Sequence, residues 1–327
     1  MRLRRPLPAV GLLLALAACE AAPPPGITSS APVARPALPA QATPRVPPAS
    51  EESRALGRFY ARLQAMLQGE GLLRQDGGAG VAYSAADLAR NFERIALYSE
   101  YAQVNGRYVA RESAAELRRW EGPVRLQLHF GPSVPADVRR ADRLRILGYV
   151  NRLRRTTGHP IEVVETGGNY HVFVASVDEQ RALGPQVVAA EPGLSRGTVR
   201  EITSLDRSTY CAVYASSAAD RPNAYVSAIA FVRSEHPDLF RQSCYHEEIA
   251  QGLGLANDNP SVRPSIFNDD EEFALLTGHD ELLLRILYDR RLRIGMTAEE
   301  ARPIVARIAA EVHPGRTATP PAPPGPV

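Results

Sequence analysis

The sequence has 327 residues, of which 44% are hydrophobic, and its 38 Lys and Arg residues are nearly balanced by 36 Asp and Glu residues. This hydrophobic share supports a sizeable folded core. Phosphate-binding surfaces need a marked basic excess, so a net charge of +2 argues against a nucleic-acid-binding protein, and we expect no nucleic-acid partner. The length allows two domains or one large α/β or α+β unit.

The N-terminus predicts a bacterial lipoprotein. Three arginines among the first five residues precede an apolar stretch at 7–16, which is too short to span a bilayer and indicates a signal peptide over residues 1–18. That segment ends in Leu16-Ala17-Ala18-Cys19, which resembles the lipobox, where the signal is cleaved before a cysteine that carries diacylglycerol. The resemblance implies lipidation of Cys19 and a periplasm-facing, lipid-anchored position in the cell envelope, with Glu20 favouring the outer membrane. An ordinary secretory signal that contains a cysteine is the alternative.

Both ends of the remaining chain are rich in proline. Residues 20–50 contain nine Pro and eight Ala with almost no large apolar residue, so residues 19–51 are expected to form an extended linker after the lipidated cysteine. The tail over residues 313–327 has the same character and is expected to be disordered.

The middle of the chain alternates between helical and strand periodicity. Apolar residues near a 3.6-residue period indicate helices, including a long one in which Leu144 and Leu147 join the apolar face, and strict alternation at 124–130 indicates a strand. Gly254 is expected to cap the helix that precedes it, and Thr297 begins a capping box with Glu300. The expected order is helices at 53–68 and 85–98, a strand at 124–130, a helix at 136–155, four strands at 161–165, 170–175, 210–215 and 225–232, and helices at 238–253, 280–288 and after Thr297.

This order predicts an α+β fold with a mixed, twisted sheet. A helical N-terminal region at 52–122 is expected to precede a main domain at 123–312, with a long backing helix, a motif helix and a small helical C-terminal subdomain. The succession of one strand, a long helix, four strands and a helix resembles the N-terminal half of the metzincin type of zincin metallopeptidases. In that family the last of these helices carries the zinc motif.

The segment from Cys244 to Asp258 carries the most informative pattern. Metzincins share H-E-x-x-H-x-x-G-x-x-H, in which two histidines on one helix face and a third after a glycine turn bind zinc, and the glutamate is the general base. With Gly254 as that glycine, the base position holds Glu248. The three ligand positions hold Glu247, Gln251 and Asn257, with Asp258 as a possible further ligand.

Downstream residues extend the resemblance. Leu253-Gly254-Leu255 looks like the Leu-Gly-Leu run of metzincins, and Ser265-Ile266-Phe267 looks like their Met-turn with Phe in place of Met. The chain also resembles an uncharacterised family of bacterial lipoproteins with the run Glu-Glu-x-x-Gln-x-x-Gly-x-x-Asn-Asp; similar closing residues are Leu276-Thr277, Asp280 and Leu287-Tyr288. A second register that starts at His246 fails because Ala250 stands where a histidine is needed.

The residues at the ligand positions leave the chemistry open. One carboxylate and two amide oxygens suit Ca²⁺, Mg²⁺ or Mn²⁺ better than Zn²⁺, which favours imidazole and thiolate. Without a metal, nothing lowers the pKa of an attacking water. A zinc site, a site for another divalent metal, and a buried polar network without metal all remain possible. The acidic run 269–272 is either an exposed loop or a source of further oxygen ligands.

Two cysteines remain after Cys19. Cys211 and Cys244 form an even pair in an oxidising compartment, which predicts a disulfide between a strand and the motif helix. A reactive thiol is the alternative.

Two hypotheses about function follow. The first is a membrane-anchored envelope lipoprotein whose degenerate metzincin-like domain binds a peptide or an envelope protein without cleaving it. The second is a metal-dependent hydrolase, a peptidase, with Glu248 as general base and its metal among Glu247, Gln251 and Asn257. The ligand chemistry favours the first hypothesis, and the glutamate and glycine turn favour the second.

Overall fold

The structure is a computed structural model that describes residues 48–104 and 107–313. The predicted signal peptide, Cys19, most of the predicted linker and the proline-rich tail beyond His313 lie outside these residues. None of the described helices combines the length and the apolar character needed to cross a membrane.

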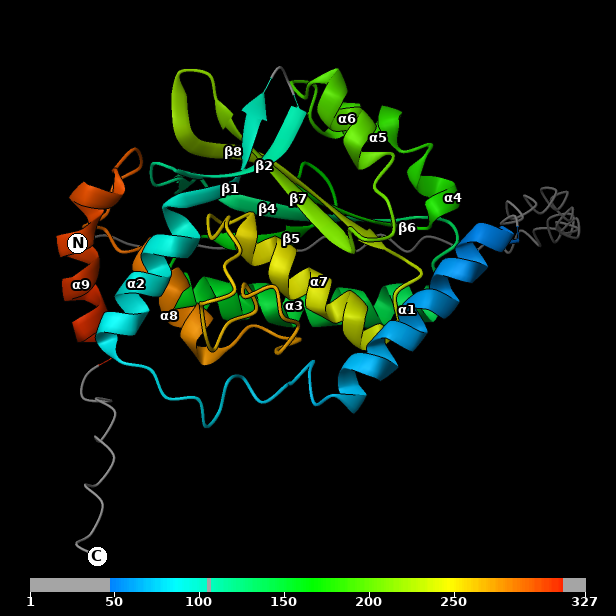
Figure 1. Cartoon of the computed structure of the whole chain (residues 1–327). Helices are drawn as coiled ribbons and strands as arrows, with labels where there is room; N and C mark the ends of the chain where they lie inside the picture. The colour runs from blue at the N-terminus through cyan, green and yellow to red at the C-terminus, as the bar shows by residue number, and fades with distance from the viewer. Residues whose placement is uncertain (1–47, 105–106, 314–327) are drawn as a thin grey trace, which may run out of the picture. The chain divides into compact units, whose positions relative to one another are not determined.

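A six-stranded mixed sheet forms the centre of the fold (Figure 1). Five strands run in the order β3-β8-β6-β4-β5, all parallel, and the sixth, β7, pairs antiparallel with β8. Among the described strands, β7 pairs with β8 alone, so its second edge is left without a strand partner. The strands are β3 (Arg119–Trp120), β4 (Val124–Phe130), β5 (Ile161–Val164), β6 (Tyr170–Ala175), β7 (Cys211–Ala218) and β8 (Arg221–Arg233).

Helices cover both faces of the sheet. Alternate residues of β6 point to opposite faces: Val172 and Val174 belong to the larger core, and Phe173 and Ala175 belong to a smaller one. The larger core is closed by α2 (Ala85–Ala96), α3 (Ala136–Thr157), α7 (Asp238–Gln251), α8 (Gly278–Leu287) and α9 (Ala298–Val312). The smaller core is closed by α4 (Val177–Gln180), α5 (Gly184–Ala190) and α6 (Arg196–Ile202).

Two elements lie beside the main layers. Helix α1 (Glu51–Gly69) is capped by Ser50, whose side chain accepts a hydrogen bond from the Ser53 backbone N–H, and it packs its Leu67 against residues of α7. A two-stranded antiparallel sheet is formed by β1 (Tyr98–Val104) and β2 (Arg107–Ala114). The region at 52–122, expected to be helical, therefore contains strands as well as its two predicted helices.

Most predicted elements are found within a few residues of their expected bounds, and the strand at 124–130 is matched at both ends. All four strands expected after α3 are present, but their uninterrupted succession is wrong, because α4, α5 and α6 lie between β6 and β7. These helices are 4 to 7 residues long, too short to give a clear helical period in the sequence.

The apolar face of α3 also differs from the prediction. Ile146, Val150 and Leu153 are buried as expected, but Leu144 is 64% exposed and Leu147 is 37% exposed. Tyr149 takes their place toward the core.

Candidate functional site

The candidate site is built on α7, which buried polar groups hold against its neighbours. The Tyr170 hydroxyl of β6 donates a 2.6 Å hydrogen bond to the backbone carbonyl of Glu248. Asp142 of α3 accepts from the Arg241 Nε at 2.6 Å and from the Tyr245 hydroxyl at 2.9 Å. Because α7 is fixed to both the sheet and α3, its side chains lie in defined positions.

Two glycines shape the turn that follows α7. The helix ends at Gln251, and a Cβ on the next residue, Gly252, would lie 2.2 Å from the Tyr170 hydroxyl. The Trp120 indole N–H donates to the Gly252 carbonyl at 2.8 Å. Gly254 has a φ of +126°, and a Cβ there would lie 2.4 Å from the Arg118 carbonyl oxygen. The prediction that Gly254 caps the helix is wrong in position, because the helix ends three residues earlier and Gly254 instead allows a close backbone approach.

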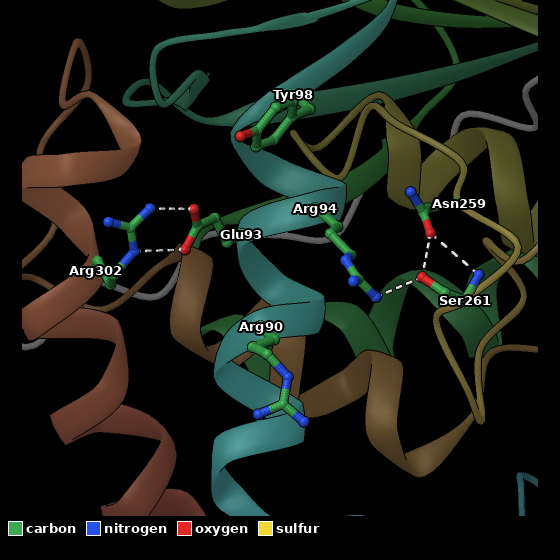
Figure 2. A pocket seen from close by; sticks show the side chains of 7 residues that line it. All are labelled: Arg90, Glu93, Arg94, Tyr98, Asn259, Ser261 and Arg302. Atoms are coloured by element: carbon green, nitrogen blue, oxygen red, sulfur yellow. Dashed lines mark hydrogen bonds and ion pairs between the residues drawn. The ribbon is translucent and has the colours of Figure 1, made fainter.

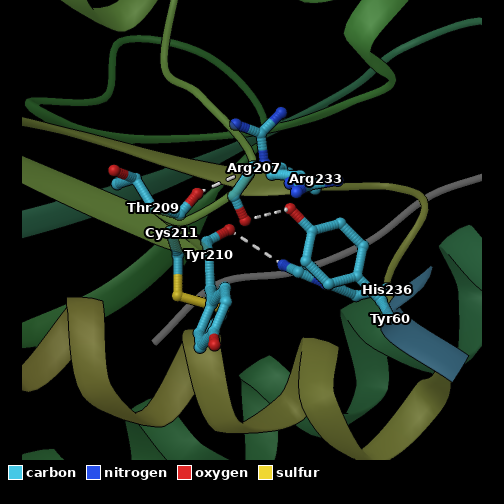
Figure 3. Close-up of a disulfide and its surroundings, with 8 residues drawn as sticks. Tyr60, Arg207, Thr209, Tyr210, Cys211, Arg233 and His236 are labelled. Atoms are coloured by element: carbon cyan, nitrogen blue, oxygen red, sulfur yellow. Dashed lines mark hydrogen bonds between the residues drawn. A yellow bond between two sulfur atoms is a disulfide. The ribbon is translucent and has the colours of Figure 1, made fainter. Parts of the chain in front are cut away.

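The predicted disulfide between Cys211 and Cys244 is present and links the start of β7 to α7 (Figure 3). Hydrogen bonds also hold the segment that leads into β7. The Tyr60 hydroxyl donates to the Arg207 carbonyl at 2.9 Å, and His236 pairs through Nε2 with the Tyr210 carbonyl at 2.8 Å. The motif helix and the edge strand therefore form one fixed unit.

Glu247 and Glu248 form the centre of an acidic cluster. A carboxylate oxygen of each and the Cys211 sulfur all lie within 4.8 Å of one another. Glu248 is 4% exposed, and its Oε2 has no hydrogen-bond partner among the described residues. Burial, followed by the charge of Asp258, raises the pKa of both Glu247 and Glu248 well above the usual value. Both carboxyl groups are therefore biased toward the protonated form.

Two residues of the acidic run 269–272 face this cluster. The charges of Glu271 and Asp269 contribute to the raised pKa of Glu247. Burial raises the pKa of Glu271 to about 7. Glu272 points elsewhere and pairs with Arg263 at 2.6 Å and Arg74 at 2.8 Å. The acidic run 269–272 therefore contributes Asp269 and Glu271 to the surroundings of Glu247, whereas Glu272 forms ion pairs with two arginines.

The amides at the other two predicted ligand positions contact the protein itself. Gln251 donates from Nε2 to both carboxylate oxygens of Asp258, at 2.9 and 3.0 Å. Asn257 donates from Nδ2 to the Arg94 carbonyl at 2.8 Å, and its backbone N–H donates to the Ile95 carbonyl. The Asn257 side chain is 1% exposed, and its Oδ1 has no described partner. Asn257 therefore ties the loop after α7 to α2.

These residues do not fit a catalytic zinc ion. Among the described residues, one group of three side chains of the metal-binding types brings its ligand atoms within 4.8 Å of one another. This group consists of Cys211, Glu247 and Glu248. Cys211 is bonded to Cys244 and has no thiolate to offer. The remaining donors are two carboxylates, whereas zinc normally takes three protein ligands rich in imidazole or thiolate. Carboxylate oxygens suit a hard cation such as Ca²⁺ better.

The neighbouring histidines have structural partners. The His246 ring stacks on Tyr149 with centroids 4.0 Å apart, and its Nδ1 accepts from the Leu276 backbone N–H. Burial lowers the pKa of His246 to about 3, so the ring is neutral. His279 lies in the first turn of α8, where Asp280 completes a capping box with Thr277, and its Nε2 pairs with the Asn91 side-chain amide at 3.0 Å.

Several residues at the site were not found from the sequence. Tyr170 looked like an ordinary strand residue, and the Asp142–Arg241 pair joins residues 99 positions apart. Ser265, singled out for its Met-turn position, donates to Asp280 at 2.6 Å, and Asp280 also accepts from the Ile266 backbone N–H. These contacts depend on tertiary packing, which no local pattern reports.

Comparison with known proteins identifies the family. No curated protein matches the chain. A family model described as "Protein of unknown function (DUF2927)" matches residues 85–307, about two thirds of the chain, from α2 into α9. The matched region contains the whole sheet, α7 and the acidic cluster. The chain therefore belongs to this DUF2927 family.

Proposed function

We propose that the protein is a lipid-anchored envelope protein whose degenerate metzincin-like domain binds an extended peptide of a partner protein without cleaving it. One observation carries the proposal. Gln251 and Asn257, which stand at two of the three metzincin ligand positions, donate hydrogen bonds from their amide nitrogens to Asp258 and to the Arg94 carbonyl. Both side chains are thus held by contacts within the protein, which supports a buried polar network in place of a metal centre.

The environment of Glu248 supports a non-catalytic role. A general base must be deprotonated at the working pH. Burial raises the pKa of Glu248 well above its usual value, and the nearby charge of Asp258 raises it further. The raised pKa biases the carboxyl group toward its protonated form, which cannot accept a proton from water, and this supports the non-catalytic role.

The edge of β7 that has no strand partner among the described residues is the proposed peptide-binding surface. An exposed strand edge offers unpaired backbone N–H and C=O groups, and an extended peptide can pair with them as an added strand. β7 pairs with β8 along one edge, and the disulfide at Cys211 fixes it beside α7. A preorganised edge lowers the entropic cost of binding. The occupant we propose is an extended segment of an envelope protein.

The anchor belongs to the same proposal. A diacylglycerol on Cys19, as the lipobox implies, would hold the domain at a membrane, and the proline-rich linker would space it from the surface. The domain would then meet partners in the periplasm. Mass spectrometry of the mature N-terminus tests this part: a diacylated Cys19 is expected, and an unmodified N-terminus at another residue would contradict it.

Peptide selection tests the binding role. The full chain in detergent is used to select linear peptides from a random display library, and binding of the selected peptides is measured by fluorescence anisotropy. We expect saturable binding that alternate backbone N-methylation abolishes, because N-methylation removes the donors of an added strand. Mass spectrometry of the incubated peptides should show no cleavage. Binding that survives N-methylation would overturn the strand-pairing mode.

A second candidate is a cation-dependent hydrolase. The observation that favours it is the buried Glu248 Oε2, which lacks a described partner and lies beside Glu247. A hard cation among these carboxylates would lower their pKa values and restore a deprotonated base. This candidate needs the cation, and the donor set points to Ca²⁺, Mg²⁺ or Mn²⁺.

Metal content separates the two candidates. Elemental mass spectrometry is applied to the wild-type chain purified without chelator, beside Glu247→Ala and Gln251→Ala. The hydrolase is supported if the wild type contains near-stoichiometric metal that both variants lose. It also requires that the wild type cleaves peptides and that Glu248→Gln abolishes this cleavage. Metal-free, folded protein in all three cases supports the binding module.

A further inference from the structure

A cavity on the α2 side of the domain is lined mostly by positive and hydrogen-bonding side chains (Figure 2). Its volume is about 540 Å³, within the range of small-molecule sites. Four parts of the chain converge on it: α2, the start of β1, the loop that follows the motif, and α9. The lining residues are Arg90, Glu93, Arg94, Tyr98, Asn259, Ser261 and Arg302.

The charges of this cavity do not balance. Arg302 is neutralised by Glu93, to which it makes hydrogen bonds of 2.6 and 3.0 Å. Arg90 pairs with Asp87, one turn earlier on α2. Arg94 makes no ion pair within the described part of the chain and donates only to the Ser261 hydroxyl. The lining thus contains three guanidinium groups and one carboxylate.

Arg94 is held in place by groups that carry no charge. Its backbone carbonyl accepts from Asn257 Nδ2 at 2.8 Å, so α2 and the loop after α7 are joined at this residue. Asn259 in turn orients Ser261, whose backbone N–H donates to Asn259 Oδ1 at 3.0 Å. The Ser261 hydroxyl also donates to Asn259 Oδ1, and the Tyr98 hydroxyl adds a further donor to the same lining. The guanidinium of Arg94 is therefore positioned before any ligand arrives.

We propose that this cavity binds the phosphate group of a small soluble phosphate monoester. A phosphate anion matches the positive charge of Arg94, the guanidinium of the lining that has no carboxylate partner among the described residues. Guanidinium groups bind phosphate through paired, charge-assisted hydrogen bonds, and the Tyr98 hydroxyl is a further donor in the lining. The volume left beside the phosphate accommodates a small organic group. This inference does not depend on the proposed peptide-binding role, since none of its residues lies on β7 or in the acidic cluster.

Glu93 is expected to tune this site. Its carboxylate competes with a bound anion for Arg302 and repels the phosphate oxygens directly. Removing that charge should strengthen phosphate binding, whereas removing Arg94 should weaken it. Opposite effects from two substitutions in one cavity cannot arise from a general loss of folding.

Isothermal titration calorimetry on the full chain in detergent, at constant ionic strength set with chloride, tests the proposal. The probes are inorganic phosphate and glycerol 3-phosphate. We expect saturable binding with a dissociation constant below about 10 mM. Arg94→Gln should weaken binding about tenfold or more, because charged hydrogen bonds are lost. Glu93→Gln should tighten it, and Arg140→Gln, an equal charge change at an exposed position of α3, should leave it unchanged.

Three outcomes would overturn the proposal. The first is no saturable binding of either probe up to about 10 mM. The second is equal weakening by Arg94→Gln and Arg140→Gln, which would indicate general charge screening. The third is binding to phosphatidylglycerol vesicles that depends on Arg94 without binding of the soluble phosphates, which would assign the cavity to a lipid headgroup.

Discussion

Tyr170 and Gly252 meet at the end of the motif helix in a contact that leaves no room for a side chain on the glycine. The Tyr170 hydroxyl donates to the Glu248 carbonyl at 2.6 Å, and a Cβ on Gly252 would lie 2.2 Å from the same hydroxyl. The backbone of Gly252 has an ordinary φ of −67°. The requirement for glycine at this position is therefore steric and not conformational.

Gly252→Ala should lower the free energy of unfolding by about 1–3 kcal/mol, because it overpacks a buried contact. Urea unfolding followed by circular dichroism measures the effect. Gly148→Ala is the matched control, since no atom lies near its Cβ position on the exposed side of α3, and it should stabilise by about 0.5–1 kcal/mol. In a Tyr170→Phe background Gly252→Ala should cost less; an unchanged cost would contradict the proposed contact.

The disulfide between Cys211 and Cys244 should contribute about 3–4 kcal/mol to stability, as the chain-entropy estimate gives for a separation of 33 residues. The double variant Cys211→Ala/Cys244→Ala is compared with wild type in urea unfolding. Addition of a reductant should destabilise the wild type and leave the double variant unchanged. A double variant as stable as the oxidised wild type would show that the bond only joins elements already held by other contacts.

The sequence predicts the parts of this fold whose periodicity is long and regular. The alternation from Val124 to Phe130 and the capping box at Thr297 are both observed. The sequence predicts the wrong face for Leu144 and Leu147, because their spacing fits a buried helix face as well as that of Tyr149 does. The stacking of Tyr149 on His246 of α7 decides which residues are buried.

The candidate site likewise contains features that the sequence predicts and others that it does not. The motif placed Glu247, Glu248, Gln251 and Asp258 near one another, and the cysteine count gave the disulfide. Neither indicated that Asn257 would turn toward α2, because its partner is a backbone carbonyl 163 residues away in sequence. Contacts with backbone atoms carry no residue-type signal and are found only from the fold.

The buried pair of Asp142 and Arg241 is expected to be costly to break. Asp142 is 0% exposed, and Arg241 binds both of its carboxylate oxygens. Asp142→Ala leaves the guanidinium without its buried partner and should cost about 3–5 kcal/mol. Chemical denaturation of Asp142→Ala beside Asp142→Leu/Arg241→Met provides the measurement. The double variant should be much less destabilised, since it leaves no unpaired charge; equal losses in both would argue that volume and not charge governs this contact.

The acidic cluster makes a prediction about pH. Burial and the neighbouring Asp258, Glu248, Glu271 and Asp269 raise the pKa of Glu247 well above its usual value near 4.5. Between that usual value and the raised one, the folded state binds more protons at Glu247 than the unfolded state does. The contribution of Glu247 to stability therefore falls as pH rises. Glu247→Gln keeps the shape of the side chain and removes this contribution.

The free energy of unfolding of Glu247→Gln minus that of wild type should therefore increase as pH rises from 5.5, measured by urea unfolding between pH 5.5 and pH 8.5 in the presence of a chelator. Taking the difference removes the contribution of the buried histidines, such as His246 with its pKa lowered to about 3, because both proteins contain them. Glu162→Gln, at an exposed position of β5, is the control and should give a flat difference. A flat difference for Glu247→Gln as well would mean that Glu247 reaches solvent and ionises freely. If the rise disappears when millimolar Ca²⁺ replaces the chelator, a bound cation keeps the carboxylates ionised. That result would support the cation-dependent hydrolase.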